Sequence, residues 1–307
     1  MIGPIIVALI PIVLLIGLGR ILRQSAFLGE GFWPQAERLC YFVLLPCLFL
    51  HGLATADLSG VRIWGFAGAL IVPTLLIAAL LVLCARRITR DGKAFTSIFQ
   101  GGIRFNNYVG VTAAIGLLGV QAVPLAAVAN AVIVPTVNIL CVLVFARFGA
   151  ARPTLRGVLS GIAFNPLVLG CAGGVVLQAS GLGLPVGVEG FVKALGQASL
   201  PLGLLCVGAA LDLKTAGRGL RPALIASTAK FVAMPLATAL ACFTFGLDRQ
   251  AVIIAVLFQA LPTASSSYVM ARQLGGDAAL MAGIIAFQTL LGLLTVPLAL
   301  VLLNLAL

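Results

Sequence analysis

The residues whose types could do chemistry gather in two apolar segments that polar residues interrupt. The first segment contains the run RFNNYVG and the second contains LPTASSSYV; their candidate binding residues are Arg104, Asn106, Asn107, Pro262, Thr263, Ser265, Ser266 and Ser267. Gly and Pro weaken helices, and Asn and Ser can hydrogen-bond the freed backbone groups. The pattern predicts two broken helices beside a substrate-binding site. Two ordinary kinked helices packed through small residues are the alternative.

Arg104 sharpens this prediction because it places a positive charge deep in an apolar segment. It lies about 15 Å along a helix that starts near residue 95, at 1.5 Å per residue, and no Asp or Glu lies deep in any apolar segment. An anionic substrate would supply the missing partner. The alternative is that Arg104 caps carbonyls of the broken helix or reaches a water-filled vestibule. Lys230, about 12 Å into its own segment, is expected to extend toward the membrane surface.

Other kinds of site find little support in the sequence. The seven cysteines include no C-x-x-C pair, and His51 is the single histidine. We therefore expect no metal site, no cofactor and no catalytic residues, and the chain is predicted not to be an enzyme. His51 is interpreted as structural. Paired aspartates and Ser/His dyads are also missing.

The elements that must position these residues are membrane helices. Of the 307 residues, 62% are apolar and only 9% are charged, which excludes a soluble domain. About 20 apolar residues span a bilayer, so the sequence predicts an all-α integral membrane protein with ten transmembrane helices. Their predicted ranges are 2–19, 33–54, 63–85, 95–117, 121–146, 157–180, 190–211, 222–245, 251–273 and 278–306.

The charged residues of the loops predict the orientation of the chain. The net charge is +11, and 14 of the 19 lysines and arginines fall in one set of alternate loops, against three in the other set. Cytoplasmic loops are enriched in Lys and Arg. We therefore expect a multi-pass protein of a bacterial inner membrane with both termini in the periplasm. The positive charge is interpreted as a topology signal, and nucleic acid is not an expected partner.

The two halves of the chain resemble each other. At a fixed offset, Arg38 matches Lys193 and Leu45-Pro46 matches Leu200-Pro201; Phe99-Gln100 is echoed by Phe258-Gln259. We predict two five-helix repeats, 1–156 and 157–307. Because five is an odd number, the second repeat must be inverted in the membrane, an arrangement typical of transporters.

Several motifs together resemble the auxin efflux carrier family. They are the two Leu-Pro motifs, RFNNYVG, LVLGCAGGVVLQ after Asn165-Pro166, and LPTASSSYVMARQLGG. The family includes bacterial malonate- and malate-type carriers and the plant PIN auxin exporters. This chain lacks the long cytoplasmic loop of many plant members. It also lacks their Asn-Pro-Asn-like crossover motif, which suggests a small anion other than auxin.

The resemblance implies an elevator fold similar to that of bile-acid symporters. It implies a scaffold of spans 1, 2, 6 and 7, and transport spans 3–5 and 8–10, with broken crossover helices 4 and 9 beside the substrate. Asn138 matches a polar position that faces the site in relatives, although a helix-packing role is the alternative. The resemblance also implies a homodimer joined through the scaffold.

The predicted function is secondary transport of a small organic anion, either a mono- or a dicarboxylate, auxin-like or malonate- or malate-like. The closest alternative is a sodium-coupled symporter of the bile-acid type. Gln100 and Gln259 lie near the predicted crossover, but no carboxylate does. A passive channel and an intramembrane enzyme are further alternatives; rings of charge that would mark a pore are not evident.

Overall fold

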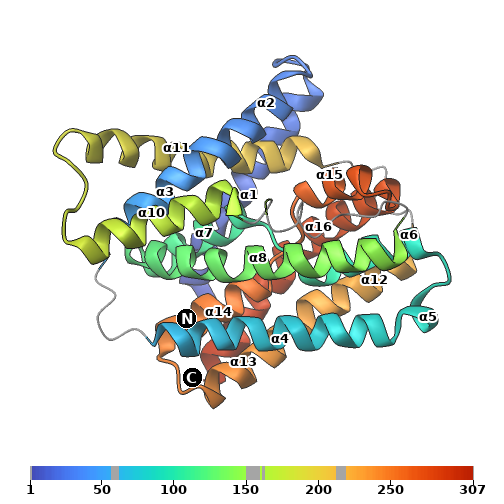
Figure 1. Ribbon diagram of the computed structural model, residues 1–307. Coiled ribbons are helices and arrows are strands. Elements are labelled where there is room, and N and C mark those ends of the chain that lie inside the picture. Colours follow the sequence, from blue (N-terminus) through green and yellow to red (C-terminus); the bar gives the residue numbers. More distant parts are fainter. Residues whose placement is uncertain (1, 57–61, 150–159, 161–162, 212–218, 307) are drawn as a thin grey trace. The chain divides into compact units, whose positions relative to one another are not determined.

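The computed structural model describes residues 2–56, 62–149, 160, 163–211 and 219–306. Every regular element in these ranges is a helix (Figure 1), which confirms the all-α prediction. Six helical stretches of the described residues are long and apolar enough to cross a membrane: Phe32–Ala54, Ile63–Leu83, Val120–Phe148, Val188–Ala210, Leu220–Thr244 and Ala278–Leu303. Pro166–Ser180 and Arg249–Gln259 are shorter apolar helices. The number of ten spans therefore stays a prediction.

The chain divides into two compact units. Unit 1 comprises residues 1–63, 107–131 and 161–210, and unit 2 comprises 64–106, 132–160 and 211–307. The predicted boundary between the repeats, at residues 156 and 157, lies outside the described residues. Unit 1 includes the helices of predicted spans 1, 2, 6 and 7, but it also takes α7 and the first part of α8. The division into scaffold and transport domains stays a prediction.

Unit 1 contains α1 (Ile2–Gln24), α2 (Phe32–Leu39), α3 (Leu45–Ala54), α7 (Asn107–Leu118), the start of α8 (Val123–Phe148), α10 (Pro166–Ser180) and α11 (Val188–Ala210). In Figure 1, α10 runs beside α3. Glycines let these helices approach closely. A Cβ atom on Gly208 of α11 would meet the carbonyl oxygen of Ile16 in α1, and one on Gly174 of α10 would lie 2.9 Å from the Leu50 carbonyl oxygen in α3.

Unit 2 contains most of α4 (Ile63–Leu83), α5 (Ala85–Ile88), α6 (Gly92–Ile103), the rest of α8, α12 (Leu220–Thr228), α13 (Met234–Thr244), α14 (Arg249–Gln259), α15 (Ser266–Gln273) and α16 (Ala278–Ala306). Within it, α6 contacts α12, α15 and α16. The pair Gly101-Gly102 does not break α6, which continues to Ile103. A Cβ atom on Gly101 would lie 2.7 Å from Ile284, so the missing side chains allow close helix packing instead.

Both predicted helix interruptions are present. The first separates α6, which ends at Ile103, from α7, which begins at Asn107; Arg104 adopts an extended conformation with φ −77° and ψ 161°. The second separates α14, ending at Gln259, from α15, beginning at Ser266. Pro262 lies in this second break, where its missing N–H costs no helical hydrogen bond.

Single turns of π-helix occur at two further places, η1 (Cys40–Leu44) and η3 (Ala229–Ala233). Each is followed by an α-helix that has a proline in its first turn, Pro46 in α3 and Pro235 in α13. Proline cannot donate a backbone hydrogen bond, and a π-turn is one way in which a helix accommodates a local irregularity. The second of these turns carries Lys230.

Candidate functional site

The guanidinium of Arg104 is the centre of a cluster within unit 2. Its Nη1 donates a hydrogen bond to Asn138 Oδ1 at 2.7 Å, and its Nη2 donates to Ser266 Oγ at 3.1 Å. The Met270 sulfur lies 3.5 Å from Nη1. Arg104 follows the end of α6, Asn138 comes from α8, and Ser266 and Met270 come from the first turns of α15. The structure thus brings together three residues that the sequence singled out, Arg104, Asn138 and Ser266.

The partners of Arg104 are all neutral. In the part of the chain that the structure describes, no carboxylate forms an ion pair with Arg104. Among the described residues, the guanidinium of Arg104 donates to the side chains of Asn138 and Ser266 and to no helix carbonyl. Its buried Nε makes no hydrogen bond within the described residues.

The groups that remain available around Arg104 are mostly donors. Asn138 uses its carbonyl oxygen for Arg104, which leaves its NH₂ group, and Ser266 uses an oxygen lone pair, which leaves its O–H. Both side chains are partly exposed, as is Arg104 itself. The cluster therefore combines a positive charge with spare hydrogen-bond donors, a combination that matches an acceptor-rich, negatively charged ligand.

Thr263 and Gln288 join the two helix breaks to each other. The Thr263 hydroxyl donates to the Gly101 carbonyl oxygen at 3.1 Å, and the Gln288 amide nitrogen donates to the same oxygen at 2.9 Å. The Thr263 N–H donates to Gln288 Oε1 at 3.1 Å. Helix ends leave carbonyls without helical partners, and Gly101 is in the last turn of α6. This clamp, formed by Gly101, Thr263 and Gln288, is fully buried.

The other predicted site residues lie in different settings. Asn106 and Pro262 are buried, Ser265 caps α15 without a side-chain cap hydrogen bond, and the buried Ser267 hydroxyl has no partner among the described residues. Asn107 begins α7 and belongs to unit 1, whereas the Arg104 cluster belongs to unit 2. Direct contact of these residues with a substrate stays a prediction.

The two glutamines near the breaks differ in their hydrogen bonding. Gln259 donates to the Leu70 carbonyl oxygen at 3.0 Å and to Thr74 Oγ1 at 2.8 Å, which ties the end of α14 to α4. Gln100 is fully buried, and neither polar atom of its amide is hydrogen-bonded within the described ranges. Those ranges hold no group of three or more His, Cys, Asp or Glu side chains placed to bind a metal ion.

The interpretation of Lys230 as a side chain that reaches the membrane surface is wrong. The residue is fully buried, and its Nζ lies 6.0 Å from the centre of the Phe105 ring. Phe105 in turn packs edge-on against Phe258, with ring centres 5.8 Å apart. Nζ makes no hydrogen bond to any described residue. Sequence position alone could not reveal this, because the direction of a long side chain depends on what packs around it.

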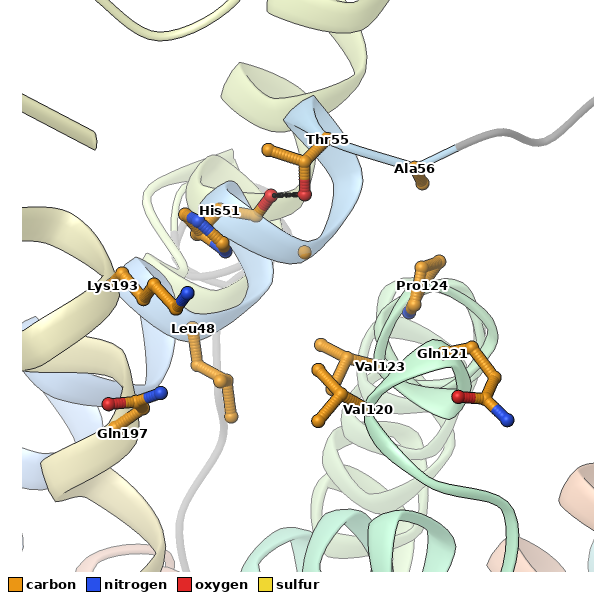
Figure 2. A pocket seen from close by; sticks show the side chains of 11 residues that line it. Leu48, His51, Thr55, Ala56, Val120, Gln121, Val123, Pro124, Lys193 and Gln197 are labelled. Carbon is orange, nitrogen blue, oxygen red and sulfur yellow. Dashed lines mark hydrogen bonds between the residues drawn. The ribbon is translucent and has the colours of Figure 1, made fainter. Parts of the chain in front are cut away.

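A separate cavity of about 390 Å³ lies in unit 1 (Figure 2). Lys193 and Gln197 of α11 project from one side, and Val120 and Val123 lie opposite them. His51 contributes to the wall; its Nε2 is 3.5 Å from Glu189 Oε1. The structural interpretation of His51 stays a prediction. The sequence did not indicate this cavity, because its residues come from three distant segments.

Comparison with known proteins agrees with a transport role. The model of a family described as "Membrane transport protein" matches residues 151–300. An uncharacterized transporter from Methanothermobacter thermautotrophicus is 23% identical over 300 residues, which make up 94% of this chain and 94% of that protein. A probable auxin efflux carrier component 5b from Oryza sativa subsp. japonica is 29% identical over 149 residues, 46% of this chain and 40% of the rice protein.

Proposed function

We propose that this chain, which is related to the auxin efflux carrier family of membrane transport proteins, is a secondary transporter for a small organic anion. The proposal places the anion at the Arg104 cluster of unit 2. It includes a multi-pass location in a bacterial inner membrane, with both termini in the periplasm. It also includes an elevator-type motion, for which the inverted repeat of sequence motifs is the support.

The observation that carries the proposal is the unneutralised charge of Arg104. Arg104 is partly exposed, so it is partly removed from water, which is unfavourable for an unpaired cation. A charged side chain within a membrane span usually marks a functional path. Here Asn138, Ser266 and Met270 orient the guanidinium without cancelling its charge. A carboxylate would provide the cancelling charge and would accept hydrogen bonds from the remaining donors.

The beginning of α15 adds to this preference for an anion. The N-terminus of a helix carries partial positive charge; in α15 the Ser267 and Tyr268 N–H groups already donate to the carbonyl oxygens of Ala264 and Ser265. Ser266 stands at the first position of α15 and holds Arg104, so the guanidinium and this helix end lie together. The two sources of positive potential therefore reinforce each other at one place.

A binding experiment tests the role of Arg104 with two complementary variants. Arg104→Gln removes the charge, and Asn138→Asp keeps the shape of Asn138 but supplies an internal carboxylate beside Arg104. We expect each to weaken binding of malonate, malate or auxin by about 10- to 150-fold, equivalent to about 1.5–3 kcal/mol for hydrogen bonds to a charged group. Arg221→Gln is the control, since it removes an exposed charge from the same unit.

The two variants separate a binding role from a purely structural one. Asn138→Asp should retain or raise the melting temperature in detergent, because it gives Arg104 a charged partner. If Asn138→Asp binds each anion as tightly as the unchanged protein, Arg104 does not contact the substrate and the proposal of an anion at this cluster fails.

Transport assays separate the proposed carrier from its alternatives. Saturable counterflow of a labelled anion in proteoliposomes supports a carrier, whereas flux that does not saturate supports a channel. The same assay with sodium replaced by choline tests the bile-acid-type symporter. Loss of uptake without sodium would favour that alternative.

We also propose a homodimer joined through the scaffold spans, as the family resemblance implies. A fixed partner would hold the scaffold still while the transport helices move. Native mass spectrometry in several mild detergents measures the oligomeric state. A monomer in all of them would contradict the dimer.

A further inference from the structure

A basic pocket lies at one end of the long helix α4, within unit 2. Its volume is about 490 Å³, and it is lined by Arg86, Thr89, Arg90, Gly92, Phe95 and Phe148 among others. These residues come from α5, the start of α6 and the end of α8. Gly92 allows the start of α6 to approach the end of α8 closely, because a Cβ atom at Gly92 would meet the Phe148 carbonyl oxygen. Phe95 and Phe148 stack edge to face, with ring centres 4.8 Å apart.

Two exposed arginines, Arg86 and Arg90, line this pocket, and no acid is among its lining residues. Arg87, Lys93 and Arg147 stand next to lining residues in the sequence, and none of these cations forms an ion pair within the described residues. The single acid of this stretch, Asp91, accepts the Lys93 N–H at 2.9 Å as the cap of α6. The lining therefore offers two guanidinium groups to an anion from outside the chain.

The position of the pocket along α4 points to the level of lipid headgroups. Trp64, at the start of α4, is 89% exposed, and aromatic residues of this type are enriched at membrane interfaces. From Trp64 to Arg86 a helix covers about 33 Å, close to the thickness of the hydrocarbon core. Trp64 and Arg86 thus fit opposite boundaries of one bilayer.

One face of α4 is apolar and exposed. Val72, Leu76, Leu80 and Leu83 follow one another at spacings of three and four residues, and Leu83 is 83% exposed. Residues at this spacing share one face of a helix. The exposed face ends three residues before Arg86. An apolar face of this kind can pack against an acyl chain, and the arginines that follow it in the sequence can form ion pairs with a phosphate.

We propose that this pocket binds the phosphate of an anionic phospholipid, whose acyl chains lie along the exposed face of α4. Arg86 and Arg90 contact the phosphate, and Phe95 and Phe148 form the apolar floor beneath the headgroup. Basic pockets at membrane surfaces bind anionic lipid headgroups in this way. The proposal is independent of the transported anion, because the pocket shares no residue with the Arg104 cluster.

The test compares lipids and variants in purified, delipidated protein. Binding of phosphatidylglycerol and phosphatidylcholine is measured by native mass spectrometry for the unchanged protein, for the Arg86→Gln/Arg90→Gln double variant and for an Arg249→Gln/Arg272→Gln control. The control removes the same charge from unit 2 outside the pocket. We expect phosphatidylglycerol to bind about 30-fold more weakly to the pocket variant, from about 1 kcal/mol per arginine.

Two further arms define the ligand and the folding of the variant. Arg86→Lys/Arg90→Lys retains both charges and should retain most of the binding, which shows that the Gln variant fails through charge and not through misfolding. Glycerol 3-phosphate in solution should bind far more weakly than the lipid. Equal loss in the pocket and control variants, equal binding of the two lipids, or tight binding of free glycerol phosphate would each overturn the proposal.

Discussion

The hydrogen bonds of the clamp formed by Gly101, Thr263 and Gln288 allow a quantitative prediction of stability. The Gly101 carbonyl oxygen accepts from both Thr263 and Gln288, and a carbonyl has two lone pairs. Thr263→Val removes one of these donors with almost no change of shape. Gln288→Leu removes the other donor and also leaves the buried Thr263 N–H without its acceptor.

The expected effects follow from these losses. Thr263→Val loses one neutral hydrogen bond, about 0.5–1.5 kcal/mol, because Gly101 keeps its second donor. Gln288→Leu exposes an unsatisfied buried N–H, which costs about 1–3 kcal/mol. The double variant additionally removes both of these donors to the Gly101 carbonyl oxygen. We therefore expect the double variant to be less stable than the sum of the single variants by about 1 kcal/mol or more.

Thermal unfolding in detergent, followed by circular dichroism, measures these differences. A change of 1 kcal/mol corresponds to about 2–4 °C for a cooperative unit of roughly 150–250 residues. Thr289→Val is the matched control, since this buried threonine follows Gln288 in α16 and its hydroxyl donates to the Ile285 carbonyl oxygen of the same helix. Additive effects of the two substitutions would show that Gly101 finds another donor, and the clamp would not be the connection that holds the breaks.

The remaining predictions concern burial, packing and topology. Lys230→Met should raise the melting temperature by several degrees, because it replaces a buried amino group that has no hydrogen bond among the described residues; a clear decrease would show that the contact of Nζ with the Phe105 ring outweighs the cost of burying it. Gly208→Ala should destabilise the protein by about 2 kcal/mol or more through overpacking, whereas Gly190→Ala, on the same helix but facing open space, should be neutral or slightly stabilising; equal melting temperatures would contradict the close approach of α1 and α11. In a background without native cysteines, Ser180→Cys should react with a membrane-impermeant thiol reagent in intact cells and Ser25→Cys should not. Both serines are exposed and bond a carbonyl three residues earlier, so reversed labelling would reverse the orientation.

The sequence predicted the helix interruptions well because their causes are local. Pro262 has no N–H to donate to a helical hydrogen bond, and polar residues follow it directly. In the first break, the polar residues Arg104 and Asn106 follow the apolar end of α6. The approach of Asn138 and Ser266 to Arg104 depends on tertiary packing, because these residues are far apart in the sequence. Asn138 entered the candidate site through family resemblance, and Ser266 through its position in the second break.

The clamp and the packing around it were beyond sequence reasoning. Gln288 is one polar residue in a long apolar helix, and no spacing pattern connects it with Gly101. The Gly101-Gly102 pair does not interrupt α6, and these glycines accommodate the close contacts of α6 with its neighbours. Close contact between helices depends on the neighbouring surface, which a single sequence does not reveal.

The chemical nature of Asn138, Ser266 and Met270, which accept hydrogen bonds from Arg104, has a consequence for the pH dependence of binding. An amide, a hydroxyl and a thioether do not ionise at physiological pH, so the hydrogen bonds that orient the guanidinium are insensitive to pH. The ionisation of the ligand then sets how binding changes with pH. A monocarboxylic acid would lose affinity through a single protonation, whereas a dicarboxylic acid would lose it in two steps. The shape of the binding curve in acid would therefore report how many carboxylates the site receives.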